Sequence, residues 1–76
     1  MERYRNLGGD SGVIAFEIGD DSITVQFKDG KHRHYLYTVA STGARDVAEL
    51  QKLAKAGRGL NSYITRVVGK RYARRW

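Results

Sequence analysis

The chain has 76 residues, no cysteine and a formal net charge of +6. A chain of this length forms one small domain with a thin hydrophobic core, and without cysteine it has neither a disulfide framework nor a thiolate zinc site. No segment approaches the ~20 apolar residues of a membrane-spanning helix, so we expect a cytoplasmic protein that is not inserted in a membrane.

The N-terminal segment, residues 1–12, is predicted to be a flexible lead-in. It contains the run Gly8-Gly9-Asp10-Ser11-Gly12, and glycine loses more conformational freedom on folding than any other residue. Ordering this segment is therefore costly, and the folded domain is expected to begin at about residue 13.

Three antiparallel strands are predicted after the lead-in. In residues 13–18, Ile14, Phe16 and Ile18 alternate with Val13, Ala15 and Glu17, and in residues 23–28 apolar and polar side chains alternate. This is the period of a strand with one buried face. On the first strand, the side chains expected in the core are those of Ile14, Phe16 and Ile18. Asp29-Gly30 follows the second strand and predicts a two-residue type I′ turn, so a third strand should run from about residue 31 to residue 37.

Two helices are predicted in the second half of the chain. Residues 43–56 carry apolar side chains at helical spacing, with one of the residues 41–43 as the N-cap and Gly57 as the stop. A second helix should cover residues 60–68 and end at Gly69. The apolar stripe of this second helix consists of Leu60, Tyr63, Ile64, Val67 and Val68.

The predicted fold is α+β, a three-stranded antiparallel β-meander followed by two helices packed on one face. Residues 13–72 form a single domain, and residues 73–76 are expected to be a basic C-terminal tail. The two edges of a three-stranded sheet are unpaired. Both a monomer and a homodimer are therefore compatible with the sequence.

The predicted helices are joined by the run Ala54-Lys55-Ala56-Gly57-Arg58-Gly59-Leu60-Asn61-Ser62-Tyr63-Ile64. This run is similar to the A-x-x-G-x-x-[FL]-N-x-x-I motif of the KTSC domain, a short module found alone in bacterial and phage proteins and at the C-terminus of some lysyl-tRNA synthetases. The likeness covers about residues 12–72. The family's function is not established, and the resemblance implies RNA binding through the attachment to synthetases.

A second motif of the family, Y-x-Y, resembles Tyr35-Leu36-Tyr37. Two alignments are open here, because spacing back from Val39 places His34 instead of Tyr35 at the first tyrosine position. The sequence also departs from the family at Ala40, where a proline commonly follows the valine.

Basic and aromatic residues form the strongest functional pattern. Residues 51–76 contain eight Lys or Arg and no acidic residue, whereas residues 1–50 contain six basic and eight acidic residues. Localised positive charge favours a polyanionic partner, and tyrosine rings beside basic side chains are what binders of single-stranded nucleic acid use. The residues expected to contact nucleic acid are Arg33, Tyr35, Tyr37, Arg58, Arg66, Lys70, Arg71, Arg74 and Arg75. At least one of the two tyrosines is expected to pack under a helix.

We therefore predict a small non-catalytic nucleic-acid-binding module that prefers RNA to DNA. The alternative is an adaptor or inhibitor that binds an acidic protein surface, since salt-dependent binding is expected of both. No nucleophile motif and no paired carboxylates in an apolar pattern indicate an enzyme, and no cofactor is predicted.

Three local features have a functional and a structural interpretation. His32 and His34 fall on one side of the predicted third strand, but no third ligand is fixed by spacing, so no metal site is predicted. Gly57-Arg58-Gly59 precedes a helix N-terminus, which binds anions, but a tight interhelical turn that needs two glycines is the preferred interpretation. Asn61 is expected to cap the second helix, and a ligand contact is the alternative.

Overall fold

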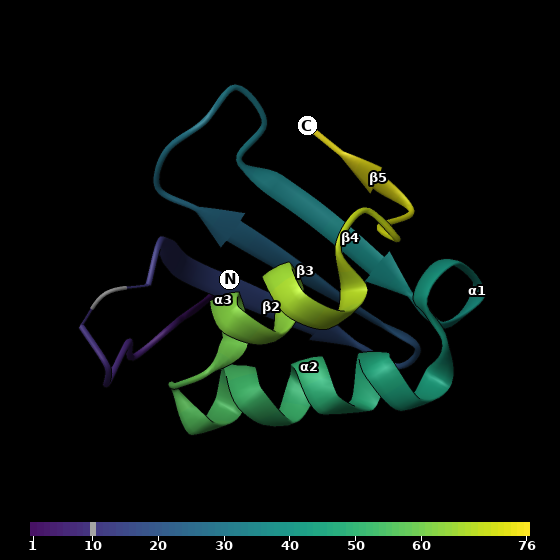
Figure 1. Cartoon of the computed structure of the whole chain (residues 1–76), viewed down its shortest axis with the longest axis horizontal. Coiled ribbons are helices and arrows are strands. Elements are labelled where there is room, and N and C mark those ends of the chain that lie inside the picture. The colour runs from purple at the N-terminus through teal and green to yellow at the C-terminus, as the bar shows by residue number, and fades with distance from the viewer. Residues whose placement is uncertain (10) are drawn as a thin grey trace.

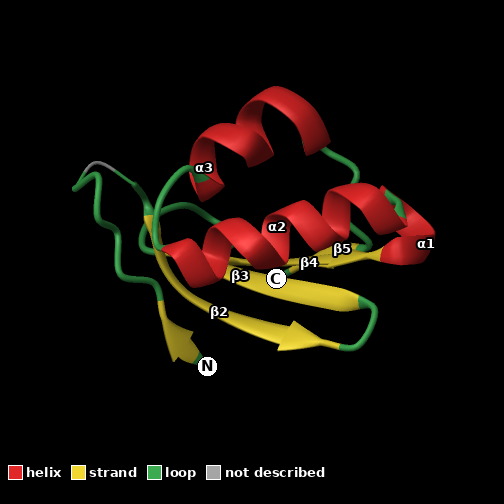
Figure 2. Ribbon diagram, turned by 90° about the horizontal axis from the view of Figure 1, so that it is seen from below, coloured by secondary structure: helices red, strands yellow, loops and turns green. Residues whose placement is uncertain are grey.

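The computed structural model describes residues 1–9 and 11–76; Asp10, within the glycine-rich run of the predicted lead-in, lies outside the described residues. One antiparallel sheet has the strand order β1-β2-β3-β4-β5, and the helices cover one of its faces (Figures 1 and 2). The predicted α+β class is confirmed. The predicted three-stranded meander is incomplete, because the sheet has five strands.

The helices and strands follow one another along the chain. They are β1 (Glu2–Arg3), β2 (Val13–Gly19), β3 (Ser22–Phe27), β4 (His34–Thr38), α1 (Val39–Thr42), α2 (Ala44–Ala56), α3 (Leu60–Tyr63), the π-helical turn η1 (Ile64–Val68) and β5 (Arg74–Arg75). Within the described residues, no helix has both the length and the apolar character that crossing a bilayer requires.

A β-bulge decides which residues of β2 face the helices. Val13 pairs with Phe27 and Ala15 pairs with Gln26, so Ile14 is an extra residue between the two pairs. Val13 is buried as a result, whereas Ile14 is 40% exposed. The prediction of a core position is therefore wrong for Ile14, because the bulge shifts the phase of the alternation.

The connection from β3 to β4 is longer than predicted. β3 ends at Phe27 and β4 begins at His34, so Lys31 lies in a loop and not in a strand. A type I′ turn needs positive φ at both central residues. Gly30 has a φ of +110°, but among the described non-glycine residues positive φ occurs only at Asn6, and Asp29 does not meet the requirement.

The N-terminal segment adds a strand to one edge of the sheet. β1 pairs with β2, and Tyr4, directly after β1, is 3% exposed. The Tyr4 hydroxyl accepts a hydrogen bond from the backbone N–H of Leu60 at the start of α3 (3.3 Å). Within the segment that the sequence assigns to a flexible lead-in, residues 2 and 3 are therefore part of the sheet and Tyr4 is part of the core.

The C-terminal segment adds a strand to the opposite edge. Arg75 of β5 lies opposite Tyr35 of β4. The backbone N–H of Trp76 donates to the carbonyl of His34 (2.9 Å). Residues 73–76, which the sequence assigns to a basic tail, are therefore paired with β4.

The short helix α1 is an element that the sequence pattern does not predict. Thr38 and Ser41 form a capping box in which each side chain accepts a hydrogen bond from the other residue's backbone N–H (3.1 and 3.2 Å). The N-cap of α2 is Gly43, which is one of the three N-cap candidates predicted at residues 41–43.

The turn from α2 to α3 supports the structural interpretation of Gly57-Arg58-Gly59. Both glycines have a φ of +78°, in the left-handed region that favours glycine. A Cβ atom built on Gly57 would also lie 2.9 Å from Cβ of Arg5. The two glycines are therefore explained by the tight turn.

The second predicted helix, residues 60–68, is helical but changes type after Tyr63. η1 is closed by a hydrogen bond from the N–H of Gly69 to the carbonyl of Ile64 (2.7 Å). Such a turn holds more residues than an α-helical turn, so Val67 is rotated off the apolar stripe and is 46% exposed. The prediction that Val67 packs in the core is wrong for this reason.

The helices cover one face of the sheet (Figure 2), and the hydrophobic core is formed by residues of both. Its buried residues are Tyr4, Val13, Phe16, Ile23, Val25, Tyr37, Leu50, Ala54, Leu60, Ile64 and Val68. The core thus joins the N-terminal segment, the three central strands, α2, α3 and η1.

We predict that Tyr4→Ala lowers the free energy of unfolding by about 3–5 kcal/mol, because truncating a buried aromatic side chain leaves a cavity. Leu7→Ala is the control, since the Leu7 side chain in the same segment is 53% exposed. It should cost less than about 1 kcal/mol. Urea denaturation followed by circular dichroism measures both values, and equally small effects would contradict the place of Tyr4 in the core.

Candidate nucleic-acid interface

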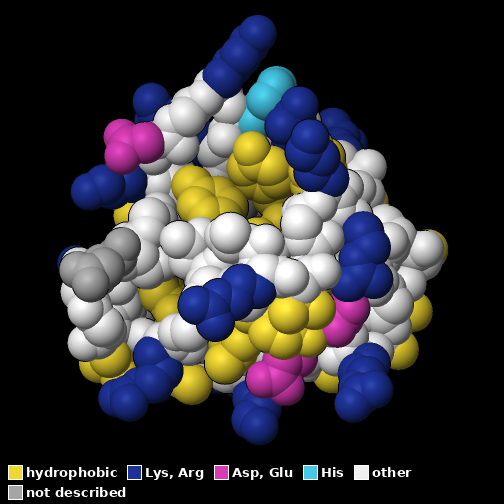
Figure 3. All heavy atoms as spheres, in the orientation of Figure 1, with side chains coloured by type: hydrophobic (Ala, Val, Ile, Leu, Met, Phe, Trp, Pro, Cys, Tyr) yellow, Lys and Arg dark blue, Asp and Glu magenta, His cyan; other side chains and the backbone are white. Residues whose placement is uncertain are grey.

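A cavity of about 690 Å³ opens between the β3–β4 loop, β4, η1 and the C-terminal segment. We call it the aromatic pocket, because four of its lining side chains are aromatic: Phe27, Tyr35, Tyr37 and Tyr72. Figure 3 shows apolar side chains gathered in this hollow, with Lys, Arg and His side chains around it. The pocket thus combines an apolar wall with a mainly basic rim.

The four rings pack edge to face. The ring of Tyr35 lies 5.3 Å from that of Phe27 and 5.2 Å from that of Tyr72, with interplanar angles of 86° and 77°. The ring of Tyr72 also meets that of Tyr37, at 6.4 Å and 80°. Edge-to-face pairs are favourable arrangements of aromatic rings. The rings therefore support one another and fix the shape of the pocket wall.

Tyr37 is the most deeply buried of the four aromatic side chains that form the pocket wall, with 1% of its surface exposed. Burial raises the pKa of its hydroxyl well above the usual range, and the nearby hydroxyls of Tyr35 and Tyr72 act in the same direction. The Tyr37 hydroxyl is therefore neutral at physiological pH, where it can both donate and accept a hydrogen bond.

Three exposed cations stand at the rim of the pocket. Lys31 comes from the β3–β4 loop, Lys70 follows η1, and Arg75 lies in β5. The Arg75 guanidinium lies 5.3 Å from the ring centroid of Tyr72, a cation–π contact. Among the described residues, none of the three cations forms an ion pair. The carboxylate of Asp29 also lines the pocket, so three positive charges and one negative charge surround it.

Four of the nine predicted site residues line this pocket, namely Tyr35, Tyr37, Lys70 and Arg75. The other five lie elsewhere: Arg33, Arg58, Arg66, Arg71 and Arg74. Arg58 lines a separate cavity of about 260 Å³ beside Tyr4. The structure thus brings together the tyrosines and part of the basic residues, and it separates the rest of the predicted set.

Arg74 belongs to the opposite face of the sheet. Its guanidinium lies 5.1 Å from the ring centroid of Trp76. Trp76 in turn stacks on His34, with ring centroids 5.3 Å apart and an interplanar angle of 8°. Arg74 lies opposite Leu36, whose neighbours Tyr35 and Tyr37 point to the helices, so Arg74 faces away from the pocket.

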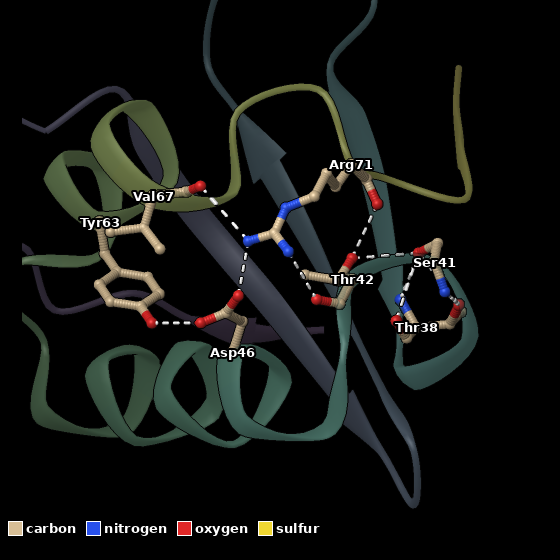
Figure 4. A network of polar contacts seen from close by, with 7 residues as sticks. All are labelled: Thr38, Ser41, Thr42, Asp46, Tyr63, Val67 and Arg71. Carbon is tan, nitrogen blue, oxygen red and sulfur yellow. Dashed lines mark hydrogen bonds and ion pairs between the residues drawn. The ribbon is translucent and has the colours of Figure 1, made fainter.

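Arg71 is engaged within the protein (Figure 4). Its guanidinium donates to the carboxylate of Asp46 and to the carbonyl of Thr42 (2.5 and 3.1 Å). Asp46 also accepts a hydrogen bond from the hydroxyl of Tyr63 (2.7 Å). The Arg71 contacts tie α1 and α2 to the segment that leads into β5, so Arg71 positions the C-terminal wall of the pocket, whereas the Tyr63 hydrogen bond ties α3 to α2.

Sequence reasoning missed several side chains of the pocket. Tyr72 was absent from the predicted site, although it lies between the predicted residues Arg71 and Arg74. Lys31 was not among the predicted contact residues, although alternation puts it on the same face as Tyr35 and Tyr37. The prediction that Asn61 caps the second helix is wrong, because the N-cap of α3 is Gly59 and no side-chain cap is formed. Asn61 lines both the aromatic pocket and the separate cavity beside Arg58, and its alternative interpretation as a ligand contact stays a prediction.

The two histidines weighed as metal ligands lie in different surroundings. His32 lines the aromatic pocket, whereas His34 stacks on Trp76. In the part of the chain that the structure describes, no group of three or more His, Cys, Asp or Glu residues could hold a metal ion.

Comparisons with known proteins return no match. No family model, no curated protein and no solved structure matches this chain. The resemblance of the sequence motifs to the KTSC domain stays a prediction.

We predict that Asp46 makes stability depend on pH in the acid range. Hydrogen bonds from Tyr63 and Arg71 hold the pKa of this carboxyl below its usual range. Such a group stabilises the native state above its unfolded pKa of about 4, and this contribution is lost as the pH falls through the lower native pKa.

In Asp46→Asn, the unfolding free energy should therefore fall less between about pH 5 and pH 3 than in the wild type. The control is Glu49→Gln, on the same helix, whose carboxylate forms no ion pair within the described residues. It should retain the wild-type dependence. Chemical denaturation at a series of pH values measures all three proteins, and identical profiles for Asp46→Asn and wild type would refute the prediction.

Proposed function

We propose that this protein is a small non-catalytic module that binds single-stranded nucleic acid, RNA in preference to DNA, through the aromatic pocket. The observation that carries the proposal is the gathering of four aromatic rings beside Lys31, Lys70 and Arg75 around one cavity. The volume of about 690 Å³ is within the range of sites that hold small organic ligands.

Two physical effects support a single strand as the ligand. Lysine and arginine neutralise phosphates and release condensed counterions. Aromatic side chains bind unstacked bases, at about 1–3 kcal/mol per base. A base can enter a concave pocket only when it has left its stack, which a duplex opposes and a single strand permits. The aromatic wall of the pocket therefore suits the base of a nucleotide, and the basic rim suits its phosphate.

The preference for RNA has two supports. The resemblance to the KTSC domain implies RNA binding, and hydrogen-bonding side chains of Asn61 and Thr65 line the pocket. Such groups can bond to a ribose 2′-hydroxyl, which DNA lacks.

Removing the rim charges tests this proposal. We predict that the triple variant Lys31→Gln, Lys70→Gln and Arg75→Gln weakens binding to a labelled single-stranded RNA of about ten nucleotides. It should also reduce the slope of log affinity against log salt by about 2, because each lost phosphate contact accounts for about 0.7. Fluorescence anisotropy at several salt concentrations measures both effects.

A matched triple variant, Arg45→Gln, Lys52→Gln and Lys55→Gln, removes the same charge from the exposed face of α2. It should keep most of the wild-type slope. Equal losses in both triples would show that diffuse charge, and not the pocket rim, binds the strand. If the wild type binds neither single-stranded RNA nor DNA at low salt, the proposed function is wrong.

A further inference from the structure

The hydroxyl of Tyr37 differs from those of two other core-facing tyrosines. The Tyr4 hydroxyl bonds to the N–H of Leu60, and the Tyr63 hydroxyl bonds to Asp46. Within residues 1–9 and 11–76, the Tyr37 hydroxyl has no such partner, although its side chain is 1% exposed. No fully enclosed side-chain polar atom of the described residues lacks a partner. The Tyr37 hydroxyl must therefore reach the surface of the aromatic pocket, which this residue lines.

A hydroxyl in this position is unfavourable for the free protein. A phenyl ring would fill the same space without placing a polar group among Tyr35, Tyr72 and the core. An unfavourably placed polar group of this kind is expected where a ligand supplies its missing hydrogen-bond partner. The Tyr37 hydroxyl thus marks a place where the ligand presents a hydrogen-bonding atom.

Asn61 supplies a second polar group to the same cavity. It is half-buried, does not cap α3, and makes no side-chain hydrogen bond within the described residues. Its amide offers both donors and an acceptor, and a neutral tyrosine hydroxyl offers one donor and an acceptor. Nucleobases present such donors and acceptors along their edges, and asparagine is a common partner for them.

We propose that the aromatic pocket takes one unstacked nucleotide, whose base lies among the rings and whose polar edge bonds to the Tyr37 hydroxyl and the Asn61 amide. The phosphate of this nucleotide meets the rim formed by Lys31, Lys70 and Arg75. This inference rests on the proposed function and assigns Tyr37 as the residue that discriminates between bases.

The pair of variants Tyr37→Phe and Tyr63→Phe tests the inference, because each removes one hydroxyl. In Tyr37→Phe the melting temperature should be equal to or above that of the wild type, while affinity for the preferred nucleoside monophosphate falls about tenfold. In Tyr63→Phe the melting temperature should fall, because the bond to Asp46 is lost, and nucleotide affinity should stay unchanged. Thermal melts and NMR titrations with AMP, CMP, GMP and UMP measure both quantities.

Three results would overturn the inference. The first is equal nucleotide affinity in Tyr37→Phe and wild type. The second is binding of ribose 5-phosphate or inorganic phosphate as tight as that of the nucleoside monophosphates. The third is no binding of any of the four monophosphates at millimolar concentration.

The single-stranded RNA titration separates this inference from the proposed function. If the wild type and Tyr37→Phe bind the oligonucleotide equally well, the base pocket is wrong and the proposed function stands. If the wild type binds monophosphates but no oligonucleotide, the base pocket stands and the proposed function is wrong.

Discussion

Backbone hydrogen bonds hold the C-terminal segment against β4, and the aromatic pocket depends on them. The carbonyl of Trp76 accepts from the N–H groups of Arg33 and His34, at 2.9 Å each. This pairing brings Tyr72 against Tyr35 and places Arg75 at the rim. Without it, one wall of the pocket and one of its cations would be absent. The edge of the sheet is thus part of the aromatic pocket and not only of the fold.

The basic residues near the C-terminus divide into those that hold the structure and those that remain available to a ligand. Lys70 and Arg71 are neighbours in sequence, but Lys70 stands at the pocket rim whereas Arg71 is bound to Asp46. The net charge of +6 therefore overstates the positive charge that is available to a ligand at the proposed site. A polyanion would meet a short rim around the rings, and the Arg71 contacts would keep that rim in place.

Local patterns predicted the central strands and the two main helical segments, because periods of two and of about 3.6 residues are written in contiguous sequence. β1 and β5 could not be predicted this way, since a two-residue strand has no period and forms only against an existing edge. The role of Arg71 was equally hidden, because its partner Asp46 lies 25 positions away. Alternation did place Tyr35 and Tyr37 on the same face of the sheet, with at least one of them expected under a helix, but the unpartnered hydroxyl of Tyr37 is visible only in three dimensions.

Chemical-shift mapping by NMR, with isotope-labelled wild-type protein and a single-stranded RNA, tests most directly whether the aromatic pocket is the binding surface. We expect the largest shifts at the amides of Lys31, Lys70 and Tyr72, and little change around Lys52 on the exposed face of α2. Shifts confined to the opposite face of the sheet around Trp76, or spread evenly over all basic residues, would contradict the pocket as the site.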